Sequence, residues 1–315
     1  MVSKPGKSME GHTIRATSVD ACGRVVYGES SQAVSEGFIS VAWTANTSDV
    51  AEIVQENARG QRCIYRRAKT SLTGYTVTIT FCEVDPELFS LITGQRVYLD
   101  ANGDAVGFAI NTDVDLGDRG FALEVWTGSP PSEDGCTNPN AAGRWGYFLA
   151  PFLKGGLLGD YSVENGAINF TIQGATTEDG NAWGVGPYNV MLGGANQPAP
   201  LNTPLLAKDH KLMIWVEVAP PEAFYGTRPV LDPSTTALTA LVVAEGAGPT
   251  EAVFTFTGGT ADGPVWIDFG DGQWDYVANG TTGSTHSYAE NGTYTARASS
   301  NGLTWVTASV VIPFL

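Results

Sequence analysis

The chain has 315 residues, of which 43% are hydrophobic, and its formal net charge is −16. This length predicts two domains, or one large β domain and a small one, and the apolar content is ample for packed cores. An acidic surface repels phosphate, so the charge argues against a protein that grips DNA.

Residues 1–12 are small and polar, and they predict a flexible N-terminal arm. This start lacks the apolar core of a signal peptide, and no apolar run in the chain approaches about 18 residues. We therefore expect neither a leader nor a membrane span. Residues 14–19 and 24–28 are expected to form a strand pair, and residues 38–45 a further strand.

Two interpretations of residues 49–67 compete. Asp49 and Glu52 resemble a capping box, which would begin a short helix. Alternatively, residues 52–56 and 63–67 pair as a hairpin across the turn at residues 57–60. We favour the hairpin because Gly60 ends the first run and the second run is β-prone. The segment also holds the basic cluster of this acidic chain, which we expect to contact a neighbouring subunit: Arg62, Tyr65, Arg66, Arg67 and Lys69.

Residues 73–94 predict a strand that leads into a helix. Apolar residues alternate with threonines up to Phe81, which is the period of a strand with one buried face. Asp85 can then cap a helix, Pro86 suits its first position, and Gly94 suits its end. We expect the apolar stripe of this helix to pack onto a sheet, with the rest of the chain as strands around it.

The following segments add more strands. Residues 96–99 and 105–110 predict a hairpin about the Asn102-Gly103 turn. Residues 127–144 predict an exposed loop, because proline, glycine and asparagine dominate them. Bulky residues occupy both alternating sets of residues 212–218, so we expect cover on both faces, from this chain or from another subunit. Other expected strands are residues 121–126, 147–153 and 168–173.

Four prolines in residues 219–233 indicate a domain boundary. Beyond it, turn signals separate seven short β-prone runs, a spacing typical of a small β-sandwich. The runs are residues 238–244, 252–257, 265–269, 274–277, 285–288, 294–299 and 304–312.

The sequence contains none of the common motifs for catalysis or metal binding. The chain has no HExxH, GxSxG or phosphate-loop pattern, and its three histidines lie in unrelated segments. Residues 268–272 offer a calcium site or, as we favour, a turn in which Gly270 and Gly272 take positive φ. We expect no enzyme activity, no catalytic residues, no cofactor and no metal.

The four cysteines are far apart and form no CxxC pair, which favours a compartment where disulfides are not needed. Cys82 ends the strand before the helix, and we expect it to be buried as a small hydrophobe.

Residues 266–296 resemble a PKD-type immunoglobulin-like domain. The family pattern is W-x-F-G-D-G followed by H-x-Y-x-x-x-G-x-Y-T, with one extra residue, Ile267, in the first part here. The residues on motif positions are Trp266, Phe269, Gly270, Asp271, Gly272, His286, Tyr288, Gly292, Tyr294 and Thr295.

Residues 1–220 resemble the major tail protein, the tail-tube subunit, of long-tailed phages that infect actinobacteria. The phrases that carry the resemblance are LTGY leading to TITFCEVDPELF at residues 72–89, GYFLAPF at 146–152, WGxGPY at 183–188 and APPE at 219–222. Such proteins often carry an immunoglobulin-like appendage, so the two resemblances reinforce each other.

The resemblance implies a mainly β fold: a tail-tube β-sandwich or barrel with one short packed α-helix, plus a C-terminal PKD-type β-sandwich. The implied organisation is an arm at residues 1–12, a tail-tube domain at 13–220, a linker at 221–234 and the immunoglobulin-like domain at 235–315. Sheet strands at 76–82, 121–126 and 168–173 are our candidates for the wall of a lumen, which we expect to be acidic or neutral.

The implied function is a structural virion protein of a siphovirus. Hexameric rings would stack into a tube for DNA ejection, made in the host cytoplasm and located in the phage tail. Implied partners are other copies of the chain, tape-measure, terminator and tip proteins, DNA in transit, and host-surface glycans through the C-terminal domain. We expect the arm and residues 49–69 to make ring-to-ring contacts. Rival functions are a secreted carbohydrate-binding or enzyme accessory protein, and a different virion component.

Overall fold

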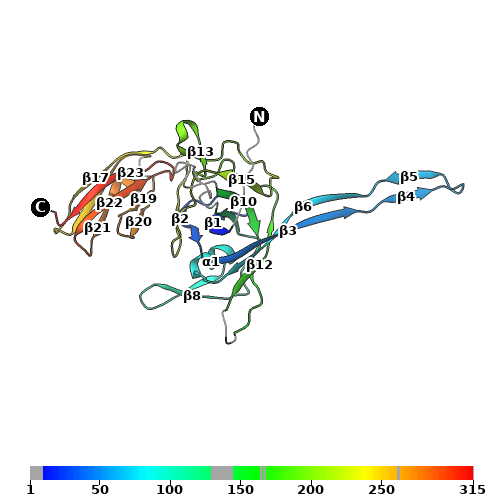
Figure 1. The fold of residues 1–315 in the computed structure, drawn as a ribbon, viewed down its shortest axis with the longest axis horizontal. Coiled ribbons are helices and arrows are strands. Elements are labelled where there is room, and N and C mark those ends of the chain that lie inside the picture. The colour runs from blue at the N-terminus through cyan, green and yellow to red at the C-terminus, as the bar shows by residue number, and fades with distance from the viewer. Residues whose placement is uncertain (1–9, 129–144, 164, 166–167, 261–262, 315) are drawn as a thin grey trace, which may run out of the picture.

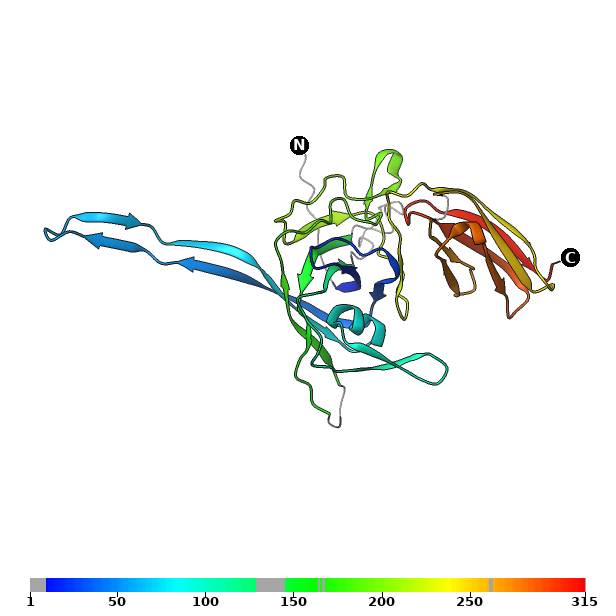
Figure 2. The same ribbon diagram turned by 180° about the vertical axis from the view of Figure 1, so that it is seen from behind.

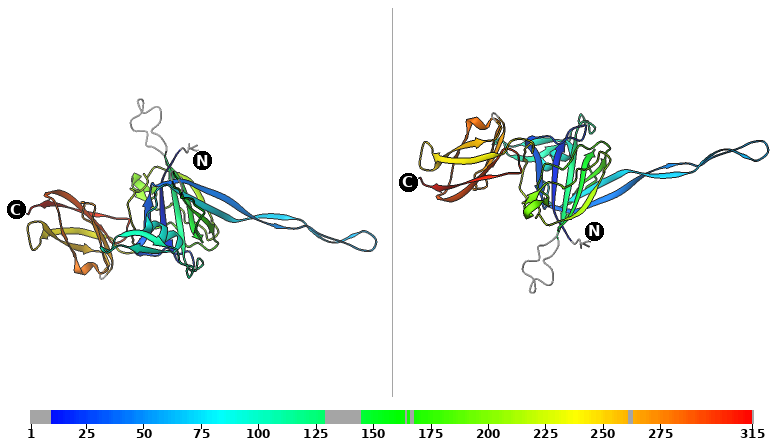
Figure 3. Two further views of the ribbon diagram at one scale, coloured as in Figure 1. Left: turned by 90° about the horizontal axis from the view of Figure 1, so that it is seen from below. Right: turned by 90° about the horizontal axis from the view of Figure 1, so that it is seen from above.

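The computed structural model describes residues 10–128, 145–163, 165, 168–260 and 263–314. These residues form a mainly β protein with one α-helix among them, as the sequence predicted. A central body carries a long hairpin on one side and the C-terminal domain on the other (Figure 1). The views from below and above in Figure 3 show the same arrangement.

The body is organised around a ten-stranded sheet. Its main path runs β16-β2-β1-β9-β10-β12-β6-β3, while β11 pairs with β12 and β15 with β10. All of these pairings are antiparallel. The strands are β1 (Gly11–Val19), β2 (Gly28–Ser35), β3 (Phe38–Val50), β6 (Lys69–Phe81), β9 (Gly120–Thr127), β10 (Trp145–Lys154), β11 (Leu157–Leu158), β12 (Phe170–Thr177), β15 (Leu212–Val216) and β16 (Arg228–Val230).

The predicted strand-to-helix unit is present. Helix α1 (Pro86–Thr93) begins at Asp85, whose carboxylate accepts hydrogen bonds from the Glu87 and Leu88 backbone amides, and Gly94 ends it with φ of 72°. Its apolar side faces the core cluster formed by β1, β6, β9 and β12. Phe89 stacks on Phe108 with ring centroids 3.9 Å apart. The helix therefore closes one face of the sheet, which gives the body its first core.

A second core covers the opposite face of β9 and β10. It combines residues of these strands with apolar residues from the irregular segment 183–205. Trp126 and Tyr147 are almost fully buried there, with ring centroids 5.1 Å apart. As a result, every residue from 120 to 126 in β9 is buried.

Short two-stranded units complete the body. β7 (Arg96–Leu99) and β8 (Ala105–Ala109) form the predicted hairpin. β13 (Met191–Leu192) and β14 (Pro198–Ala199) flank a 3-10 turn at Gly194–Asn196. β4 (Ile53–Glu56) and β5 (Arg62–Arg66) form the far part of the long hairpin.

The C-terminal domain contains the seven predicted strands. They form a three-stranded sheet, β17-β18-β21, and a four-stranded sheet, β20-β19-β22-β23, which share one apolar core. The bounds are β17 (Leu238–Glu245), β18 (Glu251–Gly258), β19 (Val265–Asp268), β20 (Trp274–Val277), β21 (Ser284–Ser287), β22 (Gly292–Ser299) and β23 (Val306–Ile312), with a 3-10 turn at Gly280–Thr282.

Several expectations need correction. Residues 24–28 do not form a strand with residues 14–19, because β1 pairs with β2 instead, and only Val19 and Val25 form an isolated bridge. Strand β12 begins at Phe170 and continues to Thr177 past a register shift after Ile172, so residues 168 and 169 lie outside it. Cys82 is exposed, because Phe81 takes the last core position of β6 and the next side chain points outward.

The segments expected as arm, loop and linker also differ in part. Residues 1–9 and 129–144 lie outside the described residues. Gly11 and His12 of the expected arm belong to β1, and Thr127 of the expected loop is the last residue of β9. Within the expected linker at 221–234, β16 pairs with β2, and the Gly226 and Thr227 amides donate to the carboxylates of Asp85 and Glu87, both at 2.5 Å. This proline-rich segment is thus attached to the body. Among the helices of the described residues, none is long and apolar enough to cross a membrane.

Candidate functional site

The long hairpin is the feature that sets this chain apart from a compact β protein. Strands β3 and β6 pair from Phe38 and Phe81 out to Val50 and Lys69, and β4 and β5 continue the ribbon. Figure 1 and Figure 2 show it extending away from the body over most of its length. The hairpin interpretation of residues 49–67 is therefore confirmed, and the helix interpretation is wrong.

The turn at the tip explains why the segment forms a hairpin. The Asn57 side-chain oxygen accepts hydrogen bonds from the backbone amides of Arg59, at 2.9 Å, and Gln61, at 3.0 Å. Gly60 adopts φ of 75°, a left-handed conformation that glycine takes without strain. These two residues close the turn and fix the register of β4 and β5.

The outer part of the hairpin is exposed on both faces. All residues of β4 and β5 are exposed. They include four large apolar side chains with exposed fractions of 43–52%, namely Ile53, Val54, Ile64 and Tyr65. A two-stranded ribbon without further packing is marginally stable in water. The apolar side chains of the outer hairpin therefore indicate a surface that packs against another molecule.

The charge of the hairpin is opposite to that of the rest of the chain. Residues 49–69 hold five of the 17 lysines and arginines and only three of the 33 acids. The predicted interface residues Arg62, Tyr65, Arg66, Arg67 and Lys69 lie together on β5 and at the start of β6, all exposed. Within the described part of the chain, none of them forms an ion pair with an acid. The Arg62 guanidinium lies 5.4 Å from the centre of the Tyr65 ring.

A β-bulge marks the root of the hairpin. Asn46 pairs with Gly74 and Thr47 with Leu72, so Thr73 is the extra residue. Gly74 has φ of 149°, and a Cβ atom there would lie 2.7 Å from the Thr177 hydroxyl oxygen. Glycine is thus required for the close approach of β6 to β12 at this point.

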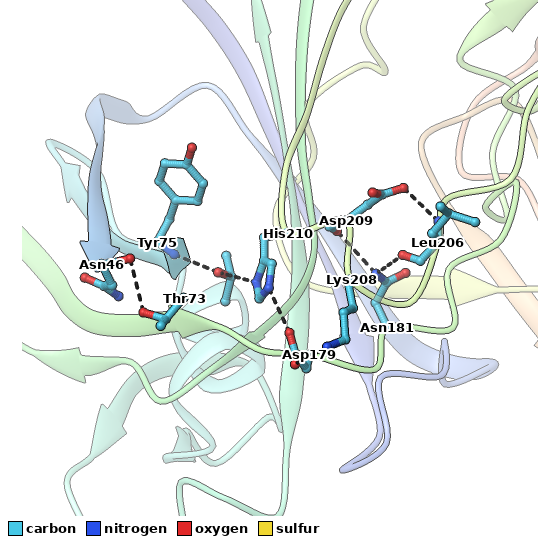
Figure 4. A network of polar contacts seen from close by, with 10 residues as sticks. Asn46, Thr73, Tyr75, Asp179, Asn181, Leu206, Lys208, Asp209 and His210 are labelled. Carbon is cyan, nitrogen blue, oxygen red and sulfur yellow. Dashed lines mark hydrogen bonds and ion pairs between the residues drawn. The ribbon is translucent and has the colours of Figure 1, made fainter. Parts of the chain in front are cut away.

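Polar contacts from the body fix this root (Figure 4). The Tyr75 backbone amide donates to the Thr177 hydroxyl at 2.8 Å. The same hydroxyl lies 2.9 Å from His210 Nδ1, and Asp179 Oδ1 lies 2.9 Å from His210 Nε2. Because these groups bridge β6, β12 and the segment before β15, the direction of the hairpin is set by the body.

Beside this root, the outer face of β3, β6 and β12 is uncharged. The register places Ser40 opposite Thr80 and Thr80 opposite Thr171, while Val41, Ile79 and Ile172 take the core side. The outer residues matched in this way are Ser40, Ala42, Thr44, Thr76, Thr78, Thr80, Thr171 and Thr176, each exposed or half-buried. We call this set the hydroxyl face.

In the C-terminal domain, five of the motif residues form one cluster. Phe269 stacks on His286 with centroids 4.0 Å apart, and His286 Nε2 lies 2.7 Å from Asp271 Oδ2. The Tyr288 hydroxyl donates to the Phe269 carbonyl at 3.0 Å, and Tyr288 stacks on Tyr294. These contacts hold the ends of the two sheets together, which is a structural use of the motif.

The glycines of this motif support the turn interpretation of residues 268–272. Gly270 and Gly272 have φ of 84° and 91°. A Cβ atom at Gly270 would lie 2.6 Å from the Thr295 carbonyl oxygen. Gly292 is the first residue of β22.

Trp266 does not join the cluster, because its neighbours Val265 and Ile267 take the core side of β19. Among the described residues, no group of three or more histidines, cysteines or acids is placed to hold a metal ion.

A buried ionic network in the body was not predicted from the sequence. Arg15 of β1 and Glu124 of β9 pair in the interior, where the Tyr147 hydroxyl donates to Glu124 Oε1 at 2.6 Å. The Arg15 guanidinium lies 3.3 Å from the centre of the Tyr188 ring. The sequence does hold one sign of this pair: Arg15 and Glu124 are each the single charged residue of a strand that is otherwise uncharged.

Comparison with protein-family models found no match for this chain, and comparison with curated proteins found none either.

Proposed function

We propose that this chain is a structural subunit that polymerises head to tail into a hollow tube and catalyses no reaction. The observation that carries the proposal is the outer hairpin, a two-stranded ribbon with apolar side chains exposed on both faces. Such a ribbon gains stability when it packs against a second copy. An interface between different surfaces of identical chains generates rings or filaments rather than closed pairs.

Electrostatics support contact between the hairpin and the body of a neighbour. The rest of the chain carries 30 acids and 12 bases, whereas residues 49–69 carry an excess of bases. Complementary charges steer association and fix register more than they add affinity. The hairpin cluster of Arg62, Arg66 and Arg67 would therefore approach acids on the next ring.

The hydroxyl face supports a role as the wall of a conduit. Lysines and arginines hold phosphates, so a surface along which DNA passes must lack them. The hydroxyl face meets this requirement on three neighbouring strands. We assign the wall to β3, β6 and β12, and we remove residues 121–126 from the predicted wall, because β9 is covered on both faces by its own chain.

Two strands offer edges for joining subunits. β3 ends the main path of the sheet, so its outer edge is open within the described chain, and Ile39 there is 52% exposed. In β15, Met213 is 61% exposed although bulky residues occupy both faces. Open strand edges pair with other chains unless they are covered, and edge-to-edge joining in a ring would cover them.

The remaining parts of the proposal rest on the resemblance to tail-tube subunits. The C-terminal domain lies on the side opposite the hairpin, so it would project outward from the tube and contact host-surface glycans. DNA and a tape-measure protein would pass through the lumen, terminator and tip proteins would close the ends, and the tube would be part of a phage tail made in the host cytoplasm.

The proposal is tested by removing the outer hairpin. Residues 51–68 are replaced with Asn-Gly, a turn that joins Val50 to Lys69, which already pair. We expect a folded monomer that forms no tubes in sedimentation and negative-stain microscopy. The control replaces residues 246–251 with Asn-Gly, which shortens a turn beside the Glu245–Ala252 pair in the C-terminal domain. The control should form tubes. Tubes of normal length from the hairpin variant would contradict the proposal.

A further inference from the structure

A cavity of about 360 Å³ lies where the C-terminal domain meets the body. The body side includes Arg15, Tyr188 and Arg228, and the domain side includes Trp266, Arg297 and Trp305. Direct contacts flank it. The Asn189 side chain donates to the Leu303 carbonyl at 3.2 Å.

Of the three arginines in this cavity, one lacks a partner of opposite charge. Arg15 pairs with Glu124, and Arg297 donates from Nε and Nη2 to Asp268 Oδ2 at 3.1 and 2.9 Å. Arg228 forms no ion pair within the described residues. Its guanidinium lies 4.1 Å from the centre of the Phe224 ring. Glu222 also lines the cavity, and its charge and that of Asp268 act on Arg228, but neither carboxylate forms an ion pair with it among the described residues. The cavity therefore has one guanidinium with no carboxylate in direct contact.

Two nitrogens in the cavity wall also lack acceptors. In the described structure, Arg228 Nε and Trp266 Nε1 are buried and have no hydrogen-bond partner. Trp266 is only 9% exposed. An unsatisfied buried donor costs roughly 1–3 kcal/mol, and more when it is charged. Burial lowers the pKa of Arg228, a further sign that its charge is poorly solvated. A bound group with acceptor oxygens would remove both costs.

Aromatic rings supply part of the cavity wall. Trp266 and Trp305 lie edge to face with centroids 5.1 Å apart, and Arg297 lies over Trp305 at 5.1 Å. On the body side, Tyr188 and Trp126 line the same space. A cavity that combines aromatic walls with a few directed polar groups is typical of small-ligand sites.

We propose that this cavity binds a small ligand in which one carboxylate is attached to a ring. Arg228 receives the carboxylate, because its planar fork of donors matches that group, and the tryptophans contact the ring. The ring belongs either to a sugar acid or to an aromatic acid. The site uses residues of both domains and is independent of the proposed polymerisation.

The test is calorimetric titration of the full chain with glucuronate and benzoate, each compared with an uncharged counterpart, glucose or benzyl alcohol. We expect saturable binding of at least one acid, tenfold or more tighter than its counterpart. If only glucuronate binds, the ligand is a sugar acid. If only benzoate binds, the ligand is an aromatic acid. Absence of saturable binding by both acids, or equal binding of acids and counterparts, would overturn the proposal.

Variants locate the site. Arg228→Gln should lose at least tenfold in affinity, and Arg228→Lys, which keeps the charge but not the fork, should lose less. Arg96→Gln, on exposed β7, is the matched control and should bind as the original chain does. A melting curve establishes that each variant is folded. If folded Arg228→Gln binds the acid unchanged, the site is not here.

Discussion

Arg15 and Glu124, on adjacent strands β1 and β9, form a two-point ion pair in the interior, with Nε–Oε2 and Nη2–Oε1 distances of 2.5 and 2.7 Å. Glu124 is fully buried and Arg15 is only 6% exposed. The pair occupies the strands that hold both cores of the body. Arg15 also lies against the ring of Tyr188, in the segment that covers the second core. The ion pair therefore connects strands β1 and β9 to that segment.

Removal of the carboxylate should destabilise the body strongly. Glu124→Ala leaves Arg15 charged and unpaired in the interior, so we expect the free energy of unfolding to fall by about 3–5 kcal/mol. Urea denaturation followed by tryptophan fluorescence measures this. Glu245→Ala, at an exposed position, is the control and should change stability by about 0.5 kcal/mol or less. A loss no larger than that of the control would show that the pair contributes little.

The same network predicts a loss of stability at high pH. Burial, with a contribution from Glu124, raises the pKa of Tyr147 well above its ordinary value. The folded chain therefore keeps this proton at a pH where the unfolded chain releases it. The contribution is complete below about pH 10, and above it the free energy of unfolding should fall by about 1.4 kcal/mol per pH unit.

Variants separate Tyr147 from other groups that titrate in this range. Tyr147→Phe should reduce the slope of stability against pH between about pH 10 and 11.5, as measured by urea denaturation. Tyr98→Phe, at an exposed position, should keep the original slope. An unchanged slope in Tyr147→Phe would mean that this phenol is not the group responsible.

A lysine on the hydroxyl face should make the lumen hold DNA. Thr78→Lys places a cation on each subunit at the proposed wall, so assembled tubes should bind labelled short DNA at low salt. Binding should weaken about tenfold or more between roughly 50 and 200 mM salt, because it depends on phosphate contacts. Thr307→Lys, at an exposed position of β23, is the control and should give weaker binding. Equal binding by the two variants would argue against β6 as the wall.

Removal of the C-terminal domain should leave assembly intact. A chain ending at residue 233 keeps β16 and the docking of residues 226–227 onto α1. Because this domain lies opposite the hairpin, we expect tubes of normal length and smaller outer diameter in negative-stain images. Binding of assembled tubes with and without the domain to bacterial cells tests its proposed contact with glycans. Failure to assemble would contradict an external position.

Local signals in the sequence predicted much of the fold. Asp85, Pro86 and Gly94 marked α1 because caps act within a few residues, and the seven strands of the C-terminal domain followed from alternation and turns. Gly60, which supplies the turn, favours a hairpin over residues 49–67, and β4 and β5 form it. These features can be predicted from the sequence because each depends on residues that are close together in the chain.

Contacts between distant segments were beyond such signals. The pairing of β16 with β2 joins residues about 200 positions apart, and no local pattern indicates it. The exposure of Cys82 needed no distant contact, because the alternation that ends at Phe81 already places the next side chain on the outer face. The cluster at Arg62–Lys69 was predicted, but its projection from the body was visible only in the fold. The cavity at Arg228 and Trp266 required the placement of both domains.

Negative-stain electron microscopy of the purified full chain, over a range of concentrations, tests the central claim most directly. We expect open-ended tubes with a central channel, built from stacked rings. Monodisperse particles of the 33.2 kDa chain at every concentration, or turnover of a sugar polymer by such particles, would contradict the account.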